Sequence, residues 1–189
     1  MESWKHKFPM QITMARIFLT IPVIMCLYPN TFYSNIFATL FFIIASISDY
    51  YDGYFARKWN ATTNMGKFMD PIADKILVTS ILTFLIAQGK CDPVMVTLLM
   101  VRDTLVGGIR AVAAADGLVI AAKSAGKWKT ALQMAAIPAV ILWELPFWPE
   151  LGSKLGWAGY FLLWISVILS ISSGIDYWNV YKKARKGRV

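Results

Sequence analysis

Four aspartates at helical spacing, beside hydrophobic stretches, are the residues of this chain best suited to chemistry. A helix advances 100° per residue, so Asp49 and Asp52 fall on one stripe of a helix, and Asp70 and Asp74 fall on another. Carboxylates in such surroundings are costly, and they therefore indicate a functional site with a compensating partner nearby. The pattern reads Asp49-x-x-Asp52-Gly53-x-x-Ala56-Arg57, then eight residues, then Gly66-x-x-x-Asp70-x-x-x-Asp74.

Hard divalent cations are the partner that best fits four converging carboxylates. Mg²⁺ and Mn²⁺ prefer oxygen ligands, and their charge offsets the buried negative charge. Gly53, Ala56 and Gly66 leave the helix faces bare, so that a flat or charged ligand can reach the backbone. The alternative to a metal site is that the aspartates lie at helix ends and pair with neighbouring cations. That interpretation explains one or two of the acids but not all four. Those cations are Arg57, Lys58, Lys67 and Lys75.

A second group of polar residues interrupts the fourth apolar stretch. Arg102 and Asp103 are adjacent, and Asp103, Gly107 and Arg110 share one helical face. A guanidinium next to a bare glycine can hold a phosphate through two hydrogen bonds. For both arginines the alternative is an interhelical ion pair that fixes packing.

Two further segments are candidate anion sites. Gly126-Lys127-Trp128-Lys129-Thr130-x-x-Gln133 opens the fifth apolar stretch, where a helix N-terminus with lysines and free amides favours an anion. The alternative interpretation of this segment is a basic loop without a bound anion. Thr13-x-x-Arg16 begins the first stretch, and Arg16 either meets a partner there or reaches back to the membrane surface.

These residues are set among apolar spans that indicate a membrane protein. The chain has 189 residues and is 57% hydrophobic, which is too apolar for a soluble domain of this size. Each span is near the roughly 20 residues that cross a bilayer. We expect one all-α membrane domain over residues 1–189, with six transmembrane helices and a short interfacial helix at Met1–Pro9. The spans lie near Met10–Tyr28, Phe32–Ser48, Phe68–Ala87, Pro93–Ala115, Thr130–Trp148 and Leu155–Val180.

The distribution of charge predicts the orientation. Of 19 Lys and Arg residues, the three outer connections hold only Lys90 and Lys154. By the positive-inside rule both termini and the aspartates face the cytoplasm from the plasma membrane. The net charge of +8 fits anionic lipids rather than nucleic acid. The outer connections are Pro29–Thr31, Gln88–Asp92 and Phe147–Lys154.

Several function classes are excluded by composition. Two cysteines, Cys26 and Cys91, are too few and too distant for a metal site or a disulfide framework. His6 is the only histidine and lies near the terminus, which excludes a Ser-His-Asp triad. The chain has no P-loop and no GxGxxG pattern for nucleotide or dinucleotide chemistry.

The aspartate pattern resembles the CDP-alcohol phosphotransferases, whose motif D-x-x-D-G-x-x-A-R, eight residues, G-x-x-x-D-x-x-x-D is matched without a gap or substitution. The resemblance implies transfer of a phosphatidyl or similar group from a CDP-linked donor to an alcohol, with release of CMP. It implies two cations per active site and a homodimer. It makes Asp49, Asp52, Asp70 and Asp74 the metal ligands, with Asp74 also accepting the proton of the attacking hydroxyl. The donor nucleotide would lie at Asp52, Gly53, Ala56, Arg57 and Gly66.

Within that family the chain is similar to the subgroup that makes phosphatidylglycerophosphate from CDP-diacylglycerol and sn-glycerol 3-phosphate. The similarity rests on residues 126–133, with Arg110 upstream and Thr13-x-x-Arg16 early in the chain. It implies an acceptor-phosphate site at Arg110, Lys127 and Lys129. Two departures are Lys7-Phe8-Pro9-Met10 in place of an Asn-Ile-Pro-Asn-like entry, and Arg102-Asp103 in place of Arg-Glu. Further candidates are Thr13, Arg16, Arg102, Thr130 and Gln133.

Other functions remain open at this point. The same chemistry could use inositol phosphate, serine, phosphatidylglycerol or choline as the acceptor. A divalent-cation transporter also needs intramembrane acids, but it places them near the midplane, often in a repeated layout. A lipid-binding scaffold has no need for four converging carboxylates.

Overall fold

Six α-helices make up most of the chain that the computed structural model describes. The described backbone covers residues 2–58, 64–116 and 124–186, and the described side chains are those of 11–48, 51, 72–114, 116 and 128–185. Within these ranges there is no strand, as the sequence predicts. The helices are α1 (Glu2–Leu27), α2 (Phe32–Lys58), α3 (Asn64–Ala87), α4 (Pro93–Ala115), α5 (Ser124–Ile141) and α6 (Pro149–Lys186).

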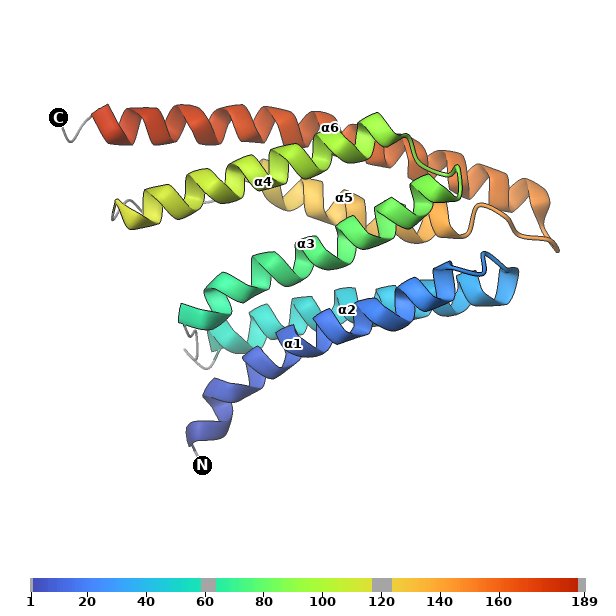
Figure 1. The fold of residues 1–189 in the computed structure, drawn as a ribbon, viewed down its shortest axis with the longest axis horizontal. Helices are drawn as coiled ribbons and strands as arrows, with labels where there is room; N and C mark the ends of the chain where they lie inside the picture. Colours follow the sequence, from blue (N-terminus) through green and yellow to red (C-terminus); the bar gives the residue numbers. More distant parts are fainter. Residues whose placement is uncertain (1, 59–63, 117–123, 187–189) are drawn as a thin grey trace.

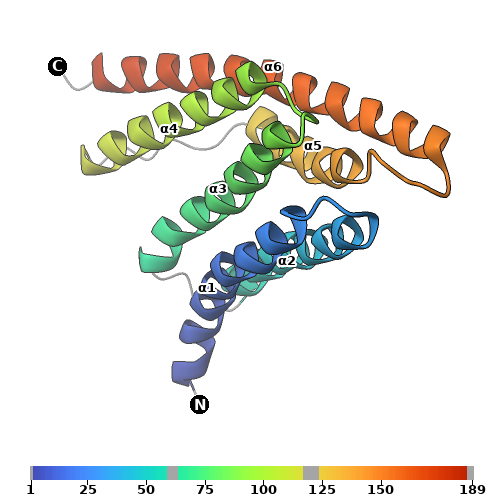
Figure 2. The ribbon, with the colours of Figure 1, turned by 45° about the vertical axis from the view of Figure 1, so that its right-hand side comes forward.

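The helices form two groups that share α3. Helix α1 packs against α2 and α3, whereas α6 packs against α5 and α4. In both ribbon views α3 lies between the α1–α2 pair and the group of α4, α5 and α6 (Figures 1 and 2). The starts of α1 and α3 lie at the same end of the bundle as the ends of α2, α4 and α6 (Figure 1). This end therefore carries the last turns of α2 and the first turns of α3, on which the aspartate motif lies.

One apolar core runs through both groups of helices. Its side chains are almost fully buried, so they hold the two groups together by removing apolar surface from water or lipid and by close packing. The largest of them are Leu27, Phe42, Leu77, Ile81, Leu82, Leu85, Met95, Ile137, Ile141 and Leu163.

At the opposite end, short turns join the helices and are tied to one another. Asn30 adopts a left-handed φ of 47°, a conformation that asparagine tolerates better than most residues. Its Oδ1 accepts hydrogen bonds from Asn35 Nδ2 and from Lys90 Nζ, each at 3.1 Å. Burial lowers the pKa of Lys90, and the charge of Glu144 opposes that shift. Helix α4 then starts at Pro93, after Asp92 has accepted a hydrogen bond from the Val94 amide at 2.6 Å.

The connection between the fifth and sixth helices differs from the sequence prediction. The fifth helix ends at Ile141 rather than at Trp148, and the sixth starts at Pro149 rather than at Leu155. Pro146 explains the first difference, because proline has no amide hydrogen and disfavours a helical residue before it. The polypeptide turns back so closely that a Cβ at Gly156 would lie 2.2 Å from Trp143 Cδ2.

The N-terminal segment also differs from the prediction. A separate interfacial helix was expected at Met1–Pro9, but residues 2–9 are the first turns of α1, which continues without interruption to Leu27. The expectation of a short, separate helix is therefore wrong for the described residues.

Helix α6 has the length and composition of a membrane span over Pro149–Arg185, and among the described residues it alone passes that test. Helices α1 and α2 contain shorter apolar stretches, Gln11–Leu27 and Phe32–Ser48. The six helices thus agree with the predicted number of elements, while a six-span topology stays a prediction.

Candidate active site

The aspartate motif lies on two consecutive helices that meet at one end of the bundle. Asp49 and Asp52 belong to the last turns of α2, and Asp70 and Asp74 to the first half of α3. The helical placement that their spacing predicts is confirmed. The side chains from Asp52 to Asp70 and that of Asp49 lie outside the described residues, so their roles as metal and nucleotide ligands stay predictions.

Asp74 is the one member of the motif whose side chain the structure describes. It is half-buried on α3, and its negative charge acts on the ammonium of Lys129 on α5. Among the described side chains no group of three or more His, Cys, Asp or Glu residues could hold a metal. The side chains of the other three aspartates lie outside the described set. The chemistry of the donor set, four carboxylates on two adjoining helices, fits a hard divalent cation.

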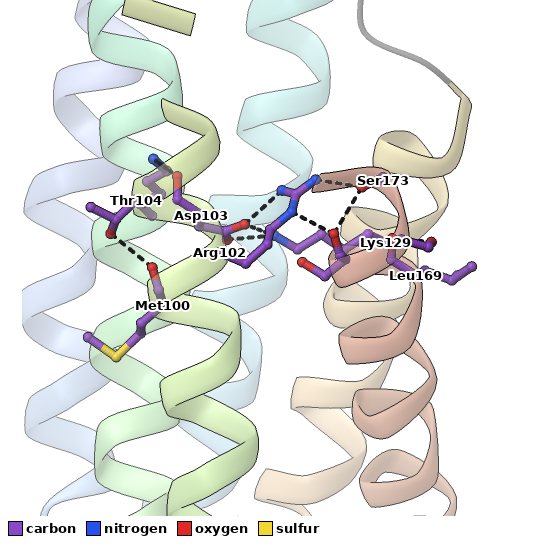
Figure 3. A network of polar contacts seen from close by, with 10 residues as sticks. Met100, Arg102, Asp103, Thr104, Lys129, Leu169 and Ser173 are labelled. Atoms are coloured by element: carbon purple, nitrogen blue, oxygen red, sulfur yellow. Dashed lines mark hydrogen bonds and ion pairs between the residues drawn. The ribbon is translucent and has the colours of Figure 1, made fainter. Parts of the chain in front are cut away.

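Asp103 is the centre of a polar network that joins α4, α5 and α6 (Figure 3). Lys129 Nζ, from the start of α5, donates to both oxygens of the Asp103 carboxylate. Arg102 Nη1 donates to Asp103 Oδ1 at 2.9 Å. The Lys129 side chain is only 7% exposed, so the carboxylate supplies the opposite charge that a buried ammonium requires.

Arg102 extends this network to α6. Its Nε donates to the Ser170 carbonyl at 2.7 Å, and its Nη2 donates to Ser173 Oγ at 2.5 Å. Figure 3 shows the guanidinium held between Asp103 and Ser173. These contacts favour the packing interpretation of Arg102, which links helices, over a role in holding a substrate phosphate.

Lys75, the neighbour of Asp74, connects α3 to the same point. Its Nζ donates to the Asp103 main-chain carbonyl at 2.7 Å. A Cβ at Gly107 would lie 2.7 Å from that Nζ, so the glycine leaves room for the ammonium. The space that we expected to admit a ligand phosphate at Gly107 is thus occupied by a lysine of the protein.

Arg110 lies two turns beyond Asp103 on α4, toward the end of the bundle that carries the motif. Its guanidinium carbon is 5.5 Å from the centre of the Tyr177 ring on α6, a cation–π distance. Arg110 itself is exposed and Tyr177 is buried. The stacked side chain is held in place while its donor groups stay accessible to an anion.

The remaining candidates differ in what surrounds them. Thr13 and Arg16 are 0% and 1% exposed, so Arg16 does not reach back to the surface. Gln133 is buried one turn after Lys129, and its Nε2 has no hydrogen-bond partner among the described residues. Thr130 is half-buried, and the side chain of Lys127 lies outside the described set.

Sequence reasoning missed the serines of α6 as partners of Arg102. Ser166, Ser170 and Ser173 are spaced by four and three residues in an otherwise apolar helix, and all three are buried. That spacing puts them on one face, which is a signal of an interior-facing polar stripe. Lys75 gave no such signal, because a lysine after an aspartate at a helix end is unremarkable.

Comparison with known proteins agrees with the motif. The family model for CDP-alcohol phosphatidyltransferase matches residues 6–172. Three relatives are each named CDP-diacylglycerol–glycerol-3-phosphate 3-phosphatidyltransferase. The Bacillus subtilis protein is 38% identical over 191 residues, covering 94% of this chain and 96% of the relative. The Rickettsia bellii protein is 35% identical, and the match covers 94% of this chain and 97% of the relative. The Haemophilus influenzae protein is 33% identical, and the match covers 94% of this chain and 95% of the relative.

The match spans both groups of helices and includes the whole aspartate motif, so it is not confined to one shared element. A family model over most of the chain and relatives above 30% identity along nearly their full length point to one family. The chain belongs to the CDP-alcohol phosphatidyltransferase family.

Proposed function

We propose that this protein is an enzyme that transfers the phosphatidyl group of CDP-diacylglycerol to sn-glycerol 3-phosphate, giving phosphatidylglycerophosphate and CMP. The observation that carries the proposal is the likeness to relatives named for this reaction over more than nine-tenths of both chains. The uninterrupted aspartate motif supports it, because a protein without this chemistry has no need for that spacing.

The motif would hold two divalent cations, Mg²⁺ or Mn²⁺, through Asp49, Asp52, Asp70 and Asp74. When bound, such cations neutralise the pyrophosphate of the donor and the charge that grows on the departing CMP. Asp74 would accept the proton of the attacking hydroxyl. A carboxylate close to cations is a weak base, so proton removal accompanies attack rather than preceding it. Gly53, Ala56 and Gly66 would leave room for the cytidine, next to Asp52 and Arg57.

An apolar groove on α2 supports a lipid donor. It has a volume of about 440 Å³ and is lined by successive turns of α2 and by Met134 of α5. Tyr51 lies at its end and directly precedes Asp52 of the motif. An acyl chain in this groove would leave the phosphate of the same lipid beside the aspartates. The α2 residues that line it are Phe42, Ile43, Ser46, Ile47 and Tyr51.

The acceptor brings a dianionic phosphate that needs positive charge of its own. Arg110, Lys127 and Lys129 would supply it from the end of α4 and the start of α5, on the same end of the bundle as the motif. Lys129 contacts the Asp103 carboxylate and also interacts with the charge of Asp74. Thr130 and Gln133 follow on α5, and Thr13 and Arg16 lie on α1. The positions fit an anion that is recognised next to the reacting carboxylate.

A lipid substrate implies a membrane setting for the whole chain, which we propose forms one domain over residues 1–189. Large apolar side chains are exposed on helices from both groups, as expected where lipid replaces water; they include Phe18, Phe37, Leu105 and Ile168. In the proposed topology all six helices cross the plasma membrane, and both termini and the motif face the cytoplasm. By family resemblance the active form is a homodimer.

The assay that tests the reaction measures CMP release from CDP-diacylglycerol in membranes that contain the protein. We expect release to depend on added sn-glycerol 3-phosphate, and we expect phosphatidylglycerophosphate as the lipid product. Inositol phosphate, serine, choline and phosphatidylglycerol serve as alternative acceptors. Equal release with one of these would show that the acceptor is assigned wrongly, and metal uptake without CMP release would support the transporter alternative.

Sidedness is tested with a single introduced cysteine. In a protein whose Cys26 and Cys91 have been replaced, Asn60→Cys should resist a membrane-impermeant thiol reagent in intact cells and react in inside-out vesicles. The replacement of Cys91 is a precaution, because burial raises its thiol pKa to about 12 and makes it a poor nucleophile. Position 60 lies outside the described residues, between α2 and α3. Labelling in intact cells would invert the proposed topology.

A further inference from the structure

Lys129 serves the proposed reaction only if its ammonium is held in a defined place, and one residue of α4 does this. We propose that Asp103 is a positioning residue for the acceptor site: it fixes the Lys129 ammonium through both of its carboxylate oxygens. The inference deepens the proposed function and rests on it. Asp103 itself touches neither the substrate nor the metals in this proposal.

The Lys129 ammonium is held by two acceptor atoms of one carboxylate. A lysine side chain has four rotatable bonds, and an ammonium with a single acceptor can swing widely about it. Here Nζ donates to both Oδ1 and Oδ2, so two acceptors on one rigid carboxylate limit its direction. The lysine side chain is 7% exposed and the aspartate side chain 22%, which leaves water little part in holding the ammonium.

Asp103 is itself held by two other cationic residues, Arg102 and Lys75. Arg102 Nη1 contacts its Oδ1 at 2.9 Å, and Arg102 is in turn bound to Ser170 and Ser173 of α6. Lys75 of α3 donates to the Asp103 carbonyl at 2.7 Å. Asp103 is therefore tied to α3 through its carbonyl and to α6 through Arg102. Because Lys75 directly follows Asp74, the Lys75 contact also links the position of Asp103 to that of the reacting carboxylate.

Asp103 and Asp74 both act on the positive charge of Lys129. Lys129 also interacts electrostatically with Asp74. Without Asp103, the ammonium would be drawn toward Asp74 and toward the cations that Asp74 is proposed to bind. Asp103 counters this pull and leaves the lysine available to an acceptor phosphate. Position 103 thereby becomes a determinant of acceptor affinity that has no contact with the acceptor.

The test compares Asp103→Asn, Asp103→Glu, Lys129→Met and the double variant Asp103→Asn/Lys129→Met by CMP release. We expect Asp103→Asn to raise KM for sn-glycerol 3-phosphate at least about tenfold and to leave KM for CDP-diacylglycerol within about twofold of the wild type. Asp103→Glu keeps the charge and should restore KM for the acceptor to within about threefold of the wild-type value. In the double variant, KM for the acceptor should equal that of Lys129→Met alone, because Asp103 acts through Lys129.

Asp92→Asn is the matched control, since it makes the same change at the N-cap of α4, where asparagine caps a helix as well as aspartate does. Its two KM values should equal those of the wild type. If Asp103→Asn does not fold, the inference is decided by comparing KM for the acceptor in the double variant with that in Lys129→Met alone. The double variant avoids the folding problem because it leaves no unpaired buried ammonium. A double variant whose effect is the product of the two single effects would overturn the inference, as would an equal rise in both KM values. Absence of acceptor-dependent CMP release in the wild type would instead refute the proposed function.

Discussion

Asp70→Ala is expected to lower the rate of CMP release by about a hundredfold to a thousandfold or more, the size of effect seen when one preorganised electrostatic group is lost. The same result is expected for Asp49→Ala and Asp52→Ala. Each change removes a carboxylate that we assign to the proposed metal site, and the reaction then lacks the positive charge that balances the pyrophosphate. The measurement is CMP release by purified variants in detergent–lipid micelles at saturating substrates. Exhaustive EDTA should abolish the wild-type activity, and added Mg²⁺ or Mn²⁺ should restore it.

A control separates loss of chemistry from loss of folding. Glu150→Ala removes an exposed acid from the first turn of α6, at the opposite end of the bundle from the motif, and should leave the rate unchanged. All variants should insert in the membrane and elute like the wild type. Activity near the wild-type level in Asp49→Ala or Asp70→Ala, or activity that survives EDTA, contradicts the two-metal proposal.

The arrangement of elements was predictable because hydrophobic stretches and polar breaks alternate clearly in this chain. The boundaries at Phe32, Ala87, Pro93 and Ala115 agree with the structure. The α5–α6 boundary was not predictable from hydropathy, because the residues from Leu142 to Trp148 are apolar enough to continue a span. Their turn depends on Pro146 and on the close approach of Trp143 to Gly156, which is a tertiary contact.

The candidate site was likewise predictable from the sequence only in part. Residues of the motif are close in sequence and share helical faces, so their placement on two helices follows from spacing alone. The ion pair of Asp103 with Lys129 spans 26 residues and two helices, and the sequence offered an acceptor-binding lysine and a lone acid rather than a pair. Likewise, nothing in the spacing indicated that Lys75 would occupy the space at Gly107. These contacts depend on how α3, α4 and α5 pack, which a single sequence does not specify.

Arg110→Ala is expected to raise KM for sn-glycerol 3-phosphate at least about tenfold, which corresponds to roughly 1.4 kcal/mol for a charge-assisted contact. The metals are committed to the donor pyrophosphate, so a phosphate-bearing acceptor needs cations from the protein. Arg110 is exposed and stacked on Tyr177, and its guanidinium is therefore held in place but accessible. KM for CDP-diacylglycerol should change much less. Lys127→Ala should give the same result, although its side chain lies outside the described residues.

Two matched variants show whether the loss is specific to this guanidinium. Lys182→Ala removes another cation that lies over an aromatic ring of α6, with Nζ 5.1 Å from the centre of Trp178, and should leave both KM values unchanged. Arg110→Lys keeps the charge but not the planar fork, so it should recover only part of the acceptor affinity. If Arg110→Ala raises both KM values together, Arg110 supports the fold or the donor site instead. If free glycerol reacts with the wild type as well as sn-glycerol 3-phosphate does, the acceptor-phosphate site does not exist, because an enzyme that binds the phosphate discriminates against an acceptor without one.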